Sequence, residues 1–347
     1  MALVTTAKKA IFLGSLYLAQ TVPKGYLKFL PVLMAEKGES MLVISAVALF
    51  SIGDWMKPLF GALVDMKKVS LLKHRKMIIV AIQVAIISVF GVSLLMEQPQ
   101  LVQLAALFSF CSLLTSLHDT AVDGLAVQLL NNDEQAVGGF GQYAGYKLGS
   151  LLTGGILPSI VGTNHRVLCV GVMLPMLVIL LTTLRFDLSQ MEDKAKEKSD
   201  ESDKLTEKNL STVVQPASQD GSLFTILQSY FTTSTGLQTV LLLLSYKFAD
   251  HGLDFIWSPM LVHANFNRRS IVQTQFILGT GAAIIGALYG SSVCKAVGSA
   301  TKALAYCSIL RIVPNLMQLW FAHTQTTNTY MGFVAAHAVL ENIAGSA

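Results

Sequence analysis

The sequence predicts an all-α polytopic membrane protein, and three composition values support this prediction. Hydrophobic residues make up 52% of the 347-residue chain, charged residues only 13%, and the mean hydropathy is +0.56. Soluble domains carry about 25% charged residues, so the composition excludes a soluble enzyme with a polar surface, a disordered chain and a coiled coil. Since a membrane-spanning helix needs about 20 apolar residues, a chain of this length has room for roughly ten or eleven spans.

Ten apolar segments are candidate spans. They cover roughly residues 10–34, 41–63, 77–96, 100–130, 136–162, 166–185, 236–262, 271–293, 300–322 and 330–347. The longest connection carries dense charge of both signs and few large apolar residues, which is typical of a solvated linker. We therefore expect an N-terminal six-helix bundle over 1–185, a charged cytosolic linker over 186–222 and an incomplete C-terminal bundle of four helices over 223–347.

Lysine and arginine fall mainly on one side of this topology. With the N-terminus in the cytosol, 15 of them lie in cytosolic segments, 4 in outer segments and the others within spans. The asymmetry follows the positive-inside rule and places the N-terminus and the linker in the cytosol. A weak internal repeat supports two related halves: Pro31 precedes a span ending in GALVD (61–65), and Pro259 precedes one ending in GALYG (286–290).

Twelve charged side chains lie inside the predicted spans, where they are costly and usually face a water-filled cavity or one another. The acids are Asp54, Asp119, Asp123, Asp250, Asp254 and Glu341, and the bases are Lys24, Lys28, Lys57, Lys147, Lys247 and Arg311. Helical spacing puts them on one face of each span, which indicates an aqueous path. The alternatives are structural ion pairs, as for Asp54 with Lys57, a boundary or gating pair at Asp123, and snorkelling of Lys28.

A glycine strip marks the fifth predicted span, where Gly141, Gly145 and Gly149 recur every four residues. Glycines at this spacing allow another backbone to approach closely. We interpret the strip as a surface for helix packing.

Two short sequence patterns are typical of other features: an acyltransferase site and a glycosylation site. His118 and Asp123 form a His-x-x-x-x-Asp pattern, which glycerolipid acyltransferases use with histidine as base and aspartate as its orienting partner. A membrane-embedded acyltransferase is therefore an alternative function, although two fixed positions often coincide by chance. Asn209-Leu-Ser211 is a glycosylation sequon, but the predicted topology places it in the cytosol.

Several segments together resemble the acetyl-CoA transporter and muropeptide permease branch of the major facilitator superfamily. They are LYLAQTVPKGYLKFLPVLMAEKG (16–38), WMKPLFGALVD (55–65), HDTAVDGLAVQLLNNDE (118–134), GYKLGS (145–150) and YKFADHG (246–252). The resemblance implies a twelve-helix fold of two six-helix bundles, alternating access around a central cavity and an acetyl-CoA-like substrate moved with protons. The chain ends at LENIAGSA within the tenth span, so we expect about ten of twelve helices. That ending indicates either a fragment or a truncated, non-transporting partner or regulator.

The resemblance also implies roles for particular residues. A polyanionic substrate needs positive charge at depth, and the candidate substrate-binding residues are Gln20, Lys24, Lys147, Lys247 and Arg311. The candidates for carrying a coupling proton are Asp119, Asp250, His251, Asp254 and Glu341. The turn at 61–76 resembles the conformational latch of the superfamily, with Gly61, Asp65, Lys67, Lys68 and Arg75 as its residues. The simpler interpretation of that turn is a positive-inside cluster.

The remaining expectations are negative or general. Cys111, Cys169, Cys294 and Cys307 lack the spacing of a disulfide framework or a metal site, and we interpret them as small apolar residues in packed helices. We expect a non-enzyme without metal or cofactor. Its partners would be a small anionic solute and the lipid bilayer, with no nucleic acid, and it would be monomeric.

Overall fold

The computed structural model describes residues 2–49, 53, 56–64, 72–96, 101–131, 134–162, 164–186, 232–234, 237–238, 256–298, 300–324 and 331–346. Every regular element in these ranges is a helix, which agrees with the predicted all-α class. The chain divides into two compact units, one formed by Met1–Phe186 with Phe255–Ala347 and the other by Asp187–Asp254. The site lies in the first unit.

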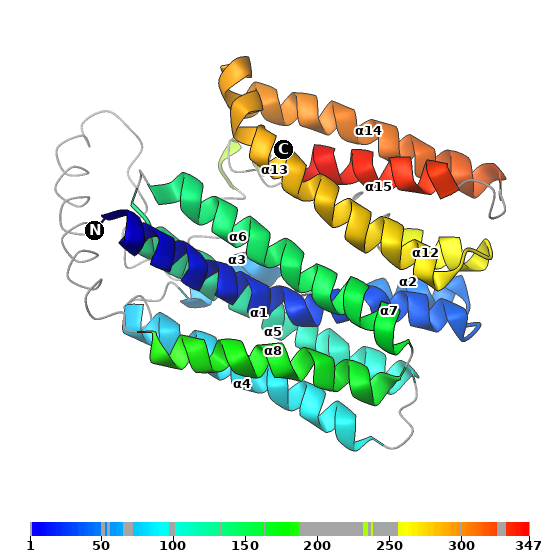
Figure 1. Ribbon diagram of the computed structural model, residues 1–347, viewed down its shortest axis with the longest axis horizontal. Helices are drawn as coiled ribbons and strands as arrows, with labels where there is room; N and C mark the ends of the chain where they lie inside the picture. Colours follow the sequence, from blue (N-terminus) through cyan, green and yellow to red (C-terminus); the bar gives the residue numbers. More distant parts are fainter. Residues whose placement is uncertain are drawn as a thin grey trace. The chain divides into compact units, whose positions relative to one another are not determined.

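The helices of the first unit are shown in Figure 1. They are α1 (Ala2–Glu36), α2 (Met41–Leu49), α3 (Lys57–Val64), α4 (Leu72–Leu95), α5 (Leu101–Leu129), α6 (Gln135–Ser150), η3 (Leu151–Ile156), α7 (Leu157–Val161), α8 (His165–Arg185), α12 (Arg268–Val272), η4 (Gln273–Leu278), α13 (Gly279–Val297), α14 (Ala300–Thr324) and α15 (Met331–Ser346). The segments η3 and η4 are π-helical and continue the α-helices on either side of them. Helices α4, α5, α8 and α14 begin and end within about five residues of predicted spans.

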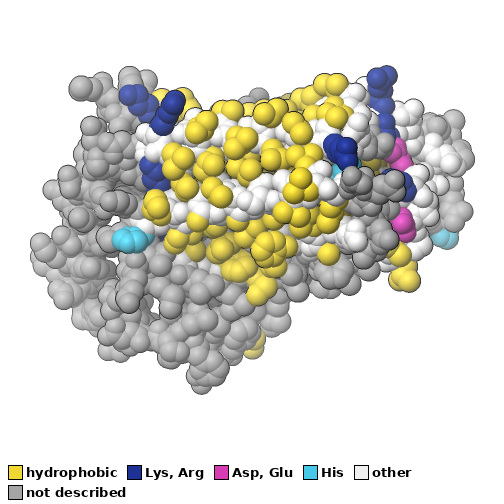
Figure 2. Space-filling model, turned by 90° about the horizontal axis from the view of Figure 1, so that it is seen from below, with side chains coloured by type: hydrophobic (Ala, Val, Ile, Leu, Met, Phe, Trp, Pro, Cys, Tyr) yellow, Lys and Arg dark blue, Asp and Glu magenta, His cyan; other side chains and the backbone are white. Residues whose placement is uncertain are grey.

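Three described helices are long and apolar enough to cross a membrane: His74–Leu95, Gln103–Leu129 and His165–Arg185. Their outward faces are apolar, with exposed residues such as Val84 and Val92 on α4 and Leu174 and Val178 on α8. Figure 2 shows hydrophobic side chains gathered over one face, with lysine and arginine toward its ends. Such an apolar band suits a bilayer. The finding supports a membrane protein, while the full set of ten spans stays a prediction.

Helix α1 lies at the centre of the N-terminal helices, packed against α5, α6 and α8 (Figure 1). Its aromatic residue Tyr26 is fully buried, and its ring centroid lies 4.9 Å from that of Phe108 on α5 and 5.9 Å from that of Phe90 on α4. Tilted and edge-on aromatic contacts at these distances stabilise a core beyond the area that they bury. This cluster therefore fixes α1 against α4 and α5.

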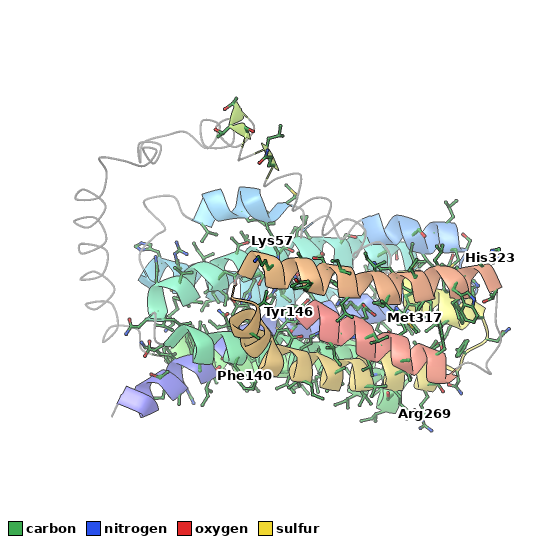
Figure 3. All side chains as sticks on the ribbon, turned by 90° about the horizontal axis from the view of Figure 1, so that it is seen from above. Lys57, Phe140, Tyr146, Arg269, Met317 and His323 are labelled. Carbon is green, nitrogen blue, oxygen red and sulfur yellow. The ribbon has the colours of Figure 1, made fainter. Side chains whose placement is uncertain are left out.

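Polar contacts join α1 to neighbouring segments in both its first and its second half. At the later end, the hydroxyl of Tyr26 pairs with Nδ1 of His165 at 3.2 Å, and Glu36 accepts a hydrogen bond from Arg268 at 2.9 Å. Arg269 and His323 are labelled toward that same end in Figure 3. At the early end, Lys9 forms an ion pair with Glu134. The start of α1 therefore lies beside the end of α5, so these two helices run antiparallel.

The glycine strip of α6 packs directly on α1, which confirms the predicted close approach. A Cβ added at Gly145 would lie 2.1 Å from the carbonyl oxygen of Gly14, and one at Gly149 would lie 2.2 Å from Oγ1 of Thr21. A Cβ at Gly141 would lie 2.7 Å from the carbonyl oxygen of Ala10. Because two of these obstacles are backbone atoms, the strip requires the absence of a side chain.

Replacing Gly145 by alanine is expected to lower the free energy of unfolding by about 1–3 kcal/mol, the usual cost of overpacking. Thermal unfolding in detergent micelles measures the effect. Gly139→Ala is the matched control, because a Cβ at Gly139 meets nothing within 4 Å and alanine is the better helix former. Equal midpoints for the two variants would refute the tight α1–α6 contact.

The start of α1 is held to the α5–α6 connection through Glu134. Its carboxylate accepts hydrogen bonds from Nζ of Lys9 at 2.7 Å, from the hydroxyl of Thr6 at 2.8 Å and from the backbone N–H of Asn131 at 3.0 Å. Partial burial raises the pKa of Glu134, but these donors outweigh burial and lower the pKa to about 2. The charged form is therefore strongly favoured in the folded protein.

Glu134→Gln is expected to lower stability at neutral pH by about 1.5–3 kcal/mol, the scale of a hydrogen bond to a charged group. A depressed folded-state pKa contributes stability that is complete above the ordinary value of 4.5 and is lost as the pH falls toward about 2. The gap between wild type and variant should therefore close over that window in a pH series of thermal melts. Glu39→Gln, in the α1–α2 connection, is the control, and a gap independent of pH would contradict the assignment.

Candidate functional site

The site is built on α5, whose inward face is polar. Ser112, Thr115, Ser116 and Asp119 recur at three- and four-residue spacing, which places them on one side of the helix, and all four are buried. Asp123 continues the same face one turn later and is exposed. Helix α5 packs against α1, α3 and α4, so this polar face lies among helices.

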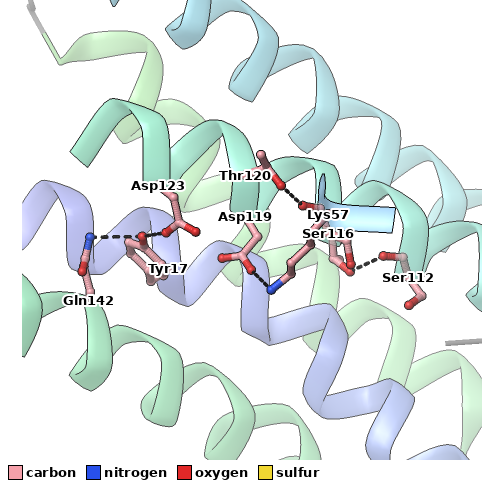
Figure 4. Close-up of polar contacts among 9 residues, drawn as sticks. Tyr17, Lys57, Ser112, Ser116, Asp119, Thr120, Asp123 and Gln142 are labelled. Carbon is pink, nitrogen blue, oxygen red and sulfur yellow. Dashed lines mark hydrogen bonds and ion pairs between the residues drawn. The ribbon is translucent and has the colours of Figure 1, made fainter. Parts of the chain in front are cut away.

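The buried carboxylate of Asp119 is paired with a lysine from another helix. Nζ of Lys57 on α3 lies 2.5 Å from Oδ2 of Asp119, and the side chains are 41% and 10% exposed. Figure 4 shows this pair beside the polar face of α5. A buried charge is tolerated when an opposite charge and hydrogen bonds compensate it, and Lys57 supplies the opposite charge for Asp119.

Asp123 takes part in a chain of hydrogen bonds whose other members are neutral side chains. The hydroxyl of Tyr17 on α1 donates to the carboxylate of Asp123, and the side-chain amide of Gln142 on α6 donates to the Tyr17 oxygen at 3.0 Å (Figure 4). The chain links α5, α1 and α6 through side chains alone. Gln142 was not singled out from the sequence, since a lone amide within a glycine-rich span forms no periodic pattern.

Gln20 and Lys24 follow Tyr17 along the same face of α1. Gln20 is fully buried, and within the described residues neither polar atom of its side-chain amide has a hydrogen-bond partner. Lys24 is half-buried. An unpaired buried amide is costly, so the capacity of Gln20 is available to a bound molecule or water.

Lys147 lies on α6 and reaches the last described helix. Its Nζ donates to Oδ1 of Asn342 on α15 at 3.2 Å and lies 5.5 Å from the ring centroid of Tyr143, a cation–π distance. Glu341, the neighbour of Asn342, lies 3.6 Å from Nδ1 of buried His337. Asn342 was not predicted, because only the packing of α15 against the first helices reveals it.

Fewer contacts are described for the other predicted residues. Arg311 is half-buried on α14. Arg75 is buried against α5 at Gly124, and a Cβ at Gly61 would lie 3.9 Å from the methyl group of Thr120. The remaining candidates lie outside the described residues: Asp54, Asp65, Lys67, Lys68, Lys247, Asp250, His251 and Asp254.

The geometry does not bring His118 and Asp123 together. Nε2 of the fully buried His118 pairs with Nε2 of Gln83 at 3.3 Å, while Asp123 accepts from Tyr17. A five-residue spacing turns two side chains about 140° apart around an α-helix. The aspartate therefore does not orient this histidine as the acyltransferase alternative requires.

Comparison with known proteins supports a transporter. No family model matches the chain. It is 23% identical over 304 residues to a Rickettsia conorii protein named "Putative transporter AmpG 4", covering 85% of this chain and 69% of that protein. The protein of the same name from Rickettsia felis is 22% identical over 302 residues, with the same shares covered. With the apolar helices described above, these similarities indicate a membrane transporter.

A double-mutant cycle tests the pairing of Lys57 with Asp119. Lys57→Met alone is expected to cost about 1–3 kcal/mol, because it leaves Asp119 buried and uncompensated. The double variant Lys57→Met/Asp119→Asn removes both charges and should recover part of that loss, as measured by thermal unfolding. If the double variant were as unstable as the sum of the single variants, the two side chains would not interact.

Proposed function

We propose that this membrane transporter moves an organic anion, with acetyl-CoA or a related solute as the leading candidate, by alternating access coupled to protons. The observation that carries the proposal is the position of two predicted substrate-binding lysines inside the helix bundle: Lys24 on α1 and Lys147 on α6. Charges at this depth are retained where they contact a pathway or one another. Two bases on two helices suit a ligand of negative charge.

The surroundings of these bases favour a ligand site. Asn342 and Tyr143 contact the ammonium group of Lys147. Gln20 precedes Lys24 by one helical turn, so its amide, which has no hydrogen-bond partner in the described part of the chain, lies on the same face as that lysine. An amide beside an ammonium group binds a carboxylate, phosphate or carbonyl oxygen. Lys247 and Arg311 are proposed to complete the set from the second half.

Alternating access is proposed to occur between a bundle over 1–185 and a second one over 223–347, joined by the cytosolic linker 186–222. Within the described residues, the two sequence regions contact each other. A Cβ at Gly154 in η3 would lie 2.4 Å from the ring of Phe276 in η4, and Arg268 contacts Glu36. These contacts lie at one end, and they would separate when that end opens. The turn at 61–76, with Gly61 and Arg75, is proposed as the latch of the other end.

Uptake into proteoliposomes tests the function, with labelled acetyl-CoA as the probe. Lys147→Ala is expected to reduce the uptake rate about tenfold or more, since one charge-assisted contact is worth about 1.5–3 kcal/mol. Lys302→Ala removes an exposed lysine of α14 and should transport as the wild type does. Absence of acetyl-CoA uptake by folded wild type would exclude this substrate. An equal effect of both variants would exclude a special role for Lys147.

A further inference from the structure

Gln83 and His118 form a polar pair that the proposed function does not yet use. Gln83 on α4 and His118 on α5 are both fully buried, and their Nε2 atoms lie 3.3 Å apart. Each belongs to a helix that is apolar and long enough to cross a membrane. Polar side chains at that depth are costly and usually serve a function. The contact between the two uses only one polar atom of each side chain.

The pair keeps one hydrogen-bond donor and one acceptor unused. In the part of the chain that the structure describes, Oε1 of Gln83 and Nδ1 of His118 have no hydrogen-bond partner. If the amide donates to Nε2, the proton of a neutral imidazole is on Nδ1, so an N–H donor and a carbonyl acceptor remain. If the amide is turned over, its NH2 group is the remaining donor and Nδ1 is the remaining acceptor. Either arrangement offers one donor and one acceptor.

Gln20 of α1 lies at the same depth in the helix bundle as this pair. Two contacts join α1 to α5 on either side of it: Tyr26 with Phe108, and Tyr17 with Asp123. Along α1, Gln20 is twice as many residues from the first contact as from the second, and His118 divides α5 in the same ratio. Gln20 is also fully buried, and neither polar atom of its amide has a partner among the described residues. Three helices therefore present unused hydrogen-bonding groups at one depth.

The chemistry of these groups selects what they can bind. A ligand group that fits the pair must both donate and accept a hydrogen bond. An amide does so through its N–H and C=O groups, whereas an ionised carboxylate or phosphate can only accept. Leaving buried polar groups without hydrogen bonds costs free energy, which an amide of a bound solute would recover.

We propose that Gln83, His118 and Gln20 form a subsite that binds a neutral amide group of the transported anion. Gln20 precedes Lys24, a proposed substrate-binding residue, by one helical turn, so the subsite adjoins the proposed anion site. The inference rests on the proposed function and narrows its substrate class to organic anions that carry an amide. Acetyl-CoA belongs to this class, because its pantetheine arm contains two amide groups.

Binding of reduced pantetheine, which has these two amides and no phosphate, tests the subsite without transport. The purified full chain in detergent micelles should unfold at a higher temperature with pantetheine than without it. Gln83→Leu/His118→Phe replaces both partners by apolar groups, so it should fold but lose the shift. Gln20→Leu is a second variant and should reduce the shift. Gln318→Leu removes another buried glutamine, on α14, and should keep the shift.

Two results of the binding experiment would overturn the proposal. One is an equal midpoint shift in wild type and in the variant Gln83→Leu/His118→Phe. The other is the absence of any shift in folded wild type, which would mean that the pair binds internal water only.

Uptake of labelled acetyl-CoA into proteoliposomes separates this inference from the proposed function. Gln83→Leu/His118→Phe should raise KM about tenfold, the effect of about two neutral hydrogen bonds, with little change in the rate at saturation. An unchanged KM would overturn the subsite and leave transport intact. If wild type took up no acetyl-CoA while pantetheine still stabilised only proteins with the intact pair, this substrate would be excluded and the subsite would stand.

Discussion

The close approach of α1 to α6 is the contact on which the polar interior depends. Glycines at 14, 141 and 145 bring the two backbones together, with a Cβ excluded at each. Only at that separation can the short amide of Gln142 on α6 reach the hydroxyl of Tyr17 on α1, and through it Asp123 on α5. The packing of small residues thus sets the geometry of the charged ones.

The interior charges are held in two different ways, and the difference matters for function. The pair formed by Lys57 and Asp119 is closed, since each charge has its opposite within contact distance. The described contacts of Asp123 and Lys147 include neutral side chains, Tyr17 and Asn342, and the amide of Gln20 has no partner within the described residues. A closed pair joins helices, whereas groups of the second kind are the ones that we propose to contact a solute. A transport pathway needs residues of both kinds.

Much of the fold could be predicted from composition and periodicity, because a span needs only length and hydropathy. The ends of α5 and α8 agree with the predicted spans, and the glycine spacing correctly indicated a tight helix contact. Partners across helices could not be predicted in this way, because they depend on how each helix is rotated about its axis. The pairing of Lys57 with Asp119 on another helix was not predicted, and Asp54, the partner suggested by spacing, lies outside the described residues. The π-helical segments also gave no periodic signal.

The mutual dependence of α1 and α6 also bears on how the protein enters the membrane. Helix α1 carries Gln20, Lys24 and Lys28, and α6 is rich in glycine. Since α1 is synthesised first and α6 only after α5, the close contact between the two helices can form only once residues 135–150 have been made. The order of synthesis therefore lets α1 pack on α5 before it can pack on α6.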